Sequence, residues 1–208
     1  MNSPALRRTV LFGAPLLGYV VAMLHPTHLR IGESPWVYIG IHLFMPVLVG
    51  LLAWMILLLV SGVENRAAMV ARLLVVPFAL VYILFSTFAG LAYGVMVWQA
   101  DRLPAAEQAG AVALIHDVFH NGIKSAIYVI AAVLWVAAVL AAAVALRGLA
   151  PLAALVLLAA GAIVFGYSHE RPWGPAGMAA ILAGVAWLEL KPKAAAEPSL
   201  VKPIRSGR

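Results

Sequence analysis

The chain has 208 residues, of which 64% are hydrophobic and only 11% are charged, and its formal net charge is +6. A soluble protein carries about a quarter charged residues, so this composition excludes an ordinary water-facing surface and predicts a protein embedded in lipid. The sequence contains no cysteine, which excludes disulfides, thiolate metal ligands and cysteine nucleophiles.

Six apolar runs are each close to the length of about 20 residues that is needed to cross a bilayer. They cover residues 9–24, 36–62, 72–99, 124–146, 151–168 and 173–190. We therefore expect an all-α fold, a polytopic bundle of six transmembrane helices in which residues 1–190 form a single domain. The remaining segment, 191–208, combines three prolines with five cations. This composition predicts a disordered basic tail.

The charges of the connecting segments indicate the orientation of the bundle. With the N-terminus inside, ten of the 14 lysines and arginines fall on inner segments, and the four outer ones are Arg30, Arg102, Lys124 and Arg171. This distribution follows the positive-inside rule. We therefore expect a protein of the bacterial inner or plasma membrane with both termini cytoplasmic. Because the basic tail has no interleaved aromatic residues and the chain has no phosphate-binding glycine loop, nucleic acid is not an expected partner.

The third apolar run contains two short polar or small-residue features. Gly90 and Gly94 form a GxxxG spacing, which we interpret as helix packing. Ser86 and Thr87 lie at depth in the same run, and we expect both hydroxyls to bond back to their own helix.

One long connection, about residues 100–123, separates the third and fourth runs. Pro104 and Glu107 are typical of a helix start, because proline fits the first turn and an acid is favoured near the positive end of the helix dipole. We expect a helix from Ala105 to His120, before the fourth span, that lies at the outer interface or dips into the mouth of the bundle.

The six histidines all fall on the outer side of this topology. They are His25, His28, His42, His116, His120 and His169. His42 is the one that lies clearly within an apolar run, where an unpaired imidazole would be costly. This one-sided clustering indicates a site at the outer end of the bundle.

His116 and His120 are spaced four apart, which places two imidazoles on one helical face as in many metal sites. For the third ligand we favour His42, then His169, and then His25 or His28. Asp117, Glu170 and His28 are predicted to orient the ligand imidazoles from a second shell.

The sequence therefore predicts a membrane metalloprotein with a Zn, Fe or Cu ion, as a metal-dependent oxidoreductase or hydrolase acting on a lipophilic small molecule. Two alternatives remain open. Histidines from different spans could bind haem b in an electron-transfer subunit. A small permease or a non-catalytic accessory subunit could use outer histidines to respond to pH.

Overall fold

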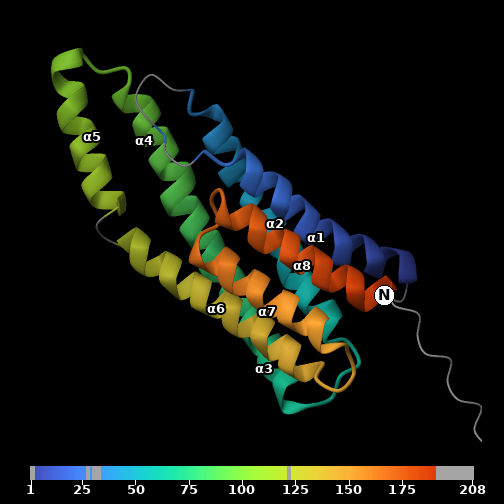
Figure 1. The fold of residues 1–208 in the computed structure, drawn as a ribbon. Coiled ribbons are helices and arrows are strands. Elements are labelled where there is room, and N and C mark those ends of the chain that lie inside the picture. The colour runs from blue at the N-terminus through green and yellow to red at the C-terminus, as the bar shows by residue number, and fades with distance from the viewer. Residues whose placement is uncertain (1–2, 27–28, 30–33, 121–122, 191–208) are drawn as a thin grey trace, which may run out of the picture.

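The computed structural model describes residues 3–26, 29, 34–120 and 123–190, and every long element within them is a helix. Figure 1 shows these helices running side by side along most of their length. Their bounds are α1 Pro4–Leu24, α2 Trp36–Leu59, α3 Arg66–Phe85, α4 Tyr93–Ala100, α5 Ala105–His120, α6 Ile123–Ala145, α7 Leu152–Tyr167 and α8 Trp173–Leu190. A π-helical segment, η1 Ser86–Ala92, joins α3 to α4, so the described residues form seven separate helices.

Five of these helices are long and apolar enough to cross a membrane, and they correspond to five of the six predicted spans. They are Pro4–Leu24, Trp36–Leu59, Arg66–Ala100, Ala126–Ala145 and Trp173–Leu190. The predicted span 151–168 becomes α7, which has 16 residues. A helix of this length measures about 24 Å, less than the roughly 30 Å of a typical hydrocarbon core. The all-α fold is therefore confirmed, with five helices that could span a membrane, whereas the six-span count is not confirmed.

The six helices of the main bundle pack in a closed ring. In order around it, α1 contacts α2, α2 contacts α3, α3 contacts α6, α6 contacts α7, α7 contacts α8, and α8 returns to α1. Trp135 is fully buried in the centre and donates a hydrogen bond from its indole Nε1 to the carbonyl of Ala162 at 3.1 Å. Large apolar side chains such as Leu73, Leu80 and Val133 are exposed on the outside of the ring, as a lipid-facing surface requires.

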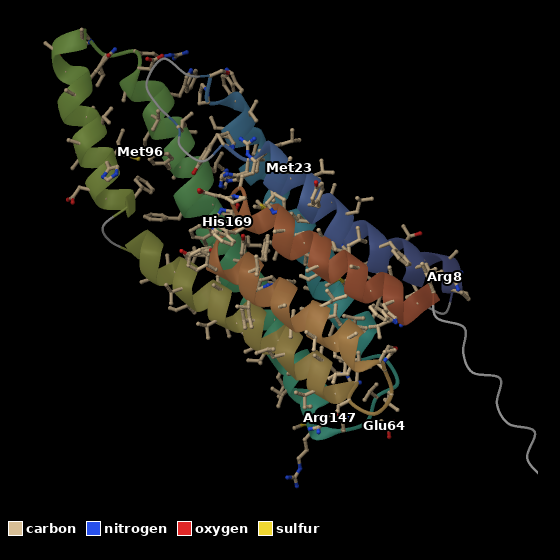
Figure 2. The ribbon with its side chains drawn as sticks, in the orientation of Figure 1. Arg8, Met23, Glu64, Met96, Arg147 and His169 are labelled. Atoms are coloured by element: carbon tan, nitrogen blue, oxygen red, sulfur yellow. The ribbon has the colours of Figure 1, made fainter. Side chains whose placement is uncertain are left out.

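Polar contacts link neighbouring helices at one end of the ring. Arg7 of α1 forms an ion pair with Glu189 of α8 at 2.6 Å. Asn65 caps α3 by accepting from the Ala68 amide, and its Nδ2 donates to the carbonyl of Ala145 at the end of α6. Figure 2 shows Arg8, Glu64 and Arg147 at this same end, with His169 well away from it. The charged termini of several helices therefore gather on one side of the bundle.

The helix α5 packs against α4 as an antiparallel hairpin that projects from the other end (Figure 1). Ile115 and Phe119 of α5 are buried against Tyr93 and Val97 in a second, smaller core. The predicted helix bounds, Ala105 to His120, are confirmed. Its predicted place at the membrane interface stays a prediction, and the predicted tail 191–208 lies outside the described residues.

Candidate metal centre

Three histidines from separate parts of the chain converge at the end of the ring that carries the hairpin. His25 caps the C-terminus of α1, His42 lies in the second turn of α2, and His169 lies in the turn between α7 and α8. Their exposed fractions are 1%, 4% and 9%. Because α1 is flanked by α2 and α8 in the ring, the ends of these helices bring the three imidazoles together.

The His25 ring lies between the other two rings. Its centroid is 5.1 Å from that of His42 and 5.1 Å from that of His169, and both contacts are edge-to-face. The Nε2 atoms of His25 and His42 are 3.5 Å apart. Two nitrogens bound tetrahedrally to one zinc at about 2.0–2.1 Å would be separated by about 3.4 Å. The observed spacing is close to the one that two ligands of a single metal ion would have.

Backbone carbonyls set the tautomers of these two rings. The Nδ1 of His25 lies 2.7 Å from the carbonyl of Pro26, and the Nδ1 of His42 lies 2.8 Å from the carbonyl of Tyr38. A carbonyl oxygen can only accept a hydrogen bond, so each Nδ1 is the protonated nitrogen of its ring. In the neutral rings both Nε2 atoms then carry lone pairs, the form in which imidazole binds a metal.

Glu170 adds a carboxylate to the same group. Ligand atoms of His25, His169 and Glu170 all lie within 4.8 Å of one another. Glu170 is half-buried, and its backbone amide donates to the Ser168 hydroxyl at 3.2 Å, which fixes the start of the turn. Glu170, which the sequence predicts only to orient the ligands, thus lies among the candidate ligands themselves. Together, His25, His169 and Glu170 could hold a metal ion.

The π-helical segment η1 makes room for His42. A methyl group placed on Gly90 would overlap the His42 imidazole, so the ring lies directly on the glycine backbone. Ser86, at the start of η1, donates its hydroxyl to the His42 carbonyl at 3.4 Å. The expectation that Ser86 bonds back to its own helix is therefore wrong. For Thr87 it is confirmed, because the Thr87 hydroxyl donates to Ile83. π-Segments are frequent at functional sites.

Aromatic side chains enclose the rest of the cluster. Tyr38 lies against His42 with ring centroids 4.3 Å apart, and Tyr128 lies against His169 at 5.4 Å. Tyr82 also contacts the His169 ring, and its buried hydroxyl makes no hydrogen bond within the described part of the chain. A cavity of about 240 Å³ opens beside the histidines, lined also by Tyr128, Tyr167 and Glu170. The cluster is thus accessible to a small polar group.

The histidines of the interfacial helix lie apart from this group. His116 and Asp117 are exposed on α5 and do not belong to the His25, His169 and Glu170 group. The side chain of His120 and all of His28 lie outside the described residues. Of the six histidines that the sequence singled out, the structure brings together His25, His42 and His169.

Sequence reasoning missed the residues that shape the site around its ligands. The spacing of Gly90 and Gly94 indicates only helix packing, and no sequence pattern marks Tyr38, Tyr82 and Tyr128 as part of the site. The GxxxG spacing was the available signal, because it marks close approach of another group to the helix backbone. Here the group that approaches Gly90 is the imidazole of His42.

Comparison of the chain with family models, with curated proteins and with solved structures gives no match. Any function must therefore be argued from the site itself.

Proposed function

We propose that this integral membrane protein binds a transition metal ion through His25, His42, His169 and Glu170. The observation that carries the proposal is the 3.5 Å separation of the His25 and His42 Nε2 atoms, with both rings held by backbone carbonyls. A cation shared by these four side chains would offset the cost of burying them in an apolar bundle.

The donor set favours a borderline metal. Three imidazoles with one carboxylate suit Zn, Fe or Cu, and no thiolate is available in this chain. The edge-to-face contact of His25 with His42, at 5.1 Å between centroids, does not favour haem b, because a haem would place its macrocycle between its two axial imidazoles.

We place the site at the outer end of a six-span topology with both termini cytoplasmic. The position of Arg8 and Arg147 at the opposite end supports this orientation. In this arrangement α7 is a short span whose C-terminal turn carries His169 at the outer boundary of the hydrocarbon. The cluster would then meet both the outer solution and the lipid.

The proposed activity is that of a metal-dependent oxidoreductase or hydrolase. A metal ion bound here would supply a Lewis acid or a redox centre. The residues of the chain would hold the ion, exclude bulk water through the rings of Tyr38, Tyr82 and Phe85, and leave the adjoining cavity of about 240 Å³ for the reacting group of a substrate.

The test is metal analysis of the purified full chain after separate incubation with Zn²⁺, Fe²⁺ and Cu²⁺ and removal of excess ion. We expect about one tightly bound ion per chain for at least one metal, and a higher unfolding temperature that chelator reverses. Absence of stoichiometric binding for all three metals would contradict the proposal. A Soret band in the protein as purified would contradict it in favour of the haem alternative.

A further inference from the structure

A second hollow runs along the outside of the ring between α6 and α7. It follows α6 from Tyr128 to Leu140 and α7 from Ile163 to Tyr167, and its volume is about 540 Å³. The lining is almost entirely apolar, and both Val133 and Ile163 in it are more than half exposed. Because it lies in membrane-spanning helices and faces outward, its natural occupant is a hydrocarbon chain.

This apolar groove adjoins the histidine cavity. Tyr128, Val129 and Tyr167 line both hollows. At the junction the Tyr128 hydroxyl donates to the Gly166 carbonyl at 3.2 Å, which ties α6 to α7 and holds the Tyr128 ring against His169. The end of the groove at Tyr128 and Tyr167 therefore lies next to the cavity that the candidate ligands line.

The shape of the groove points to a single chain. Between Val129 and Leu140 it extends for about 16 Å along α6. A Cβ atom on Gly166 would lie 2.7 Å from Val136, so the two helices approach closely at its floor. The groove ends at Tyr128 and Tyr167, which also line the histidine cavity, and there a polar head group would replace the hydrocarbon.

We propose that this groove binds the hydrocarbon chain of a single-chain amphiphile whose oxygen-bearing head group enters the histidine cavity. The proposal rests on the proposed metal site and names the class of substrate that the site receives. Oxygen is the expected donor atom of the head group, because imidazole-bound Zn, Fe or Cu accepts oxygen ligands at an open position. The chain gives affinity, and the head group is positioned at the metal.

The test uses photoreactive palmitic acid with a diazirine in its chain, added to the metal-loaded full chain in lipid nanodiscs. The control probe is a diazirine hexadecane that lacks the carboxyl group. We expect saturable labelling of peptides within 129–140 and 163–167 by the acid, and only weak, unsaturable labelling by the alkane. Equal labelling of these peptides by both probes would overturn the proposal, because it would show an ordinary lipid contact.

Ala137→Trp fills the groove, whereas Ala179→Trp places the same side chain on an exposed position of α8 that lines neither hollow. We expect Ala137→Trp to weaken saturable labelling at least about tenfold, because the probe loses contacts of several methylene groups. Ala179→Trp should label as the wild type does. Equal labelling of the two variants would overturn the proposal that this groove binds the hydrocarbon chain.

Metal content measured on the same samples separates the two proposals. Ala137→Trp should retain its metal ion, so loss of labelling with retained metal supports the groove. Metal binding without any saturable labelling of the wild type would overturn the groove and leave the metal centre standing. Saturable labelling in protein without bound metal would overturn the proposal that the metal ion positions the head group.

Discussion

His25 and His42 face each other through their Nε2 atoms at 3.5 Å, while the Nδ1 of each is held by a backbone carbonyl. Since each Nδ1 carries a hydrogen, the two facing nitrogens cannot form a hydrogen bond while both rings are neutral. A proton or a metal cation between the two Nε2 atoms would make this contact favourable. The nearby ligand atoms of His169 and Glu170 favour the metal, because a proton would not require further donors.

Replacing His25 by alanine should abolish tight metal binding. His25 is the ring that contacts both other imidazoles, so its loss removes a ligand and separates the remaining ones. We expect the dissociation constant to rise at least about 100-fold, measured by competition with a chromophoric chelator. His116→Ala is the matched control and should keep wild-type affinity, because His116 is exposed on α5. Equal losses in the two variants would contradict this set of ligands.

Gly90→Ala should damage the site through sterics alone. The added methyl overlaps the His42 ring, and the ring must move away from His25. We expect metal affinity to fall at least tenfold and the free energy of unfolding to fall by about 1–3 kcal/mol. Gly40→Ala is the control on the same helix as His42, since a methyl there meets nothing within 4 Å. Wild-type metal affinity in Gly90→Ala would show that His42 is not a ligand.

Tyr82→Phe and Tyr128→Phe each remove one phenolic hydroxyl, but we expect them to change the free energy of unfolding differently. The Tyr128 hydroxyl donates to Gly166, so its loss should lower the free energy of unfolding of the metal-free protein by about 1 kcal/mol. The buried Tyr82 hydroxyl makes no hydrogen bond within the described residues, so its removal should leave that free energy unchanged or raise it. Denaturant titration in chelator measures both values. A loss in Tyr82→Phe as large as in Tyr128→Phe would contradict the described arrangement.

The helices were largely predictable, because runs of apolar residues in a chain with so few charges have one stable form in lipid. The run 151–168 shows the limit of that reasoning. Pro151 lies before the first helical residue and Ser168 has extended backbone, so the helix ends after 16 residues. Composition cannot detect such local ends, and the predicted count of six spans therefore exceeds the five helices that are long enough.

The sequence predicts the end of the bundle at which the histidines lie, but it does not predict which of them meet. The cost of burying His42 and the common side of the histidines indicate the end of the bundle where His25, His42 and His169 lie together. The preferred pair, His116 and His120, was chosen by spacing within one helix. The observed group instead forms because α1 packs between α2 and α8, which joins His25 to His42 and His169. Contacts between helices depend on packing and cannot be read from spacing along one of them.

Because the chain has no cysteine, single cysteines can test whether α7 crosses the membrane. Leu149 and Arg171 are both exposed and flank this helix. The six-span topology predicts that Leu149→Cys reacts with a membrane-impermeant maleimide only from the cytoplasmic side, and Arg171→Cys only from the outer side. Ser61→Cys and Glu107→Cys mark the two sides as controls. Reaction of both flanking cysteines from one side would mean that α7 enters and leaves the same face.

The most direct measurement is X-ray absorption of the metal-loaded protein. With Zn²⁺ bound, we predict a first shell of nitrogen and oxygen atoms at about 2.0–2.1 Å, with the multiple-scattering pattern of three imidazoles. In His25→Ala that pattern should weaken or the metal should be lost. A spectrum dominated by water oxygens, unchanged between the wild type and His25→Ala, would contradict the metal centre.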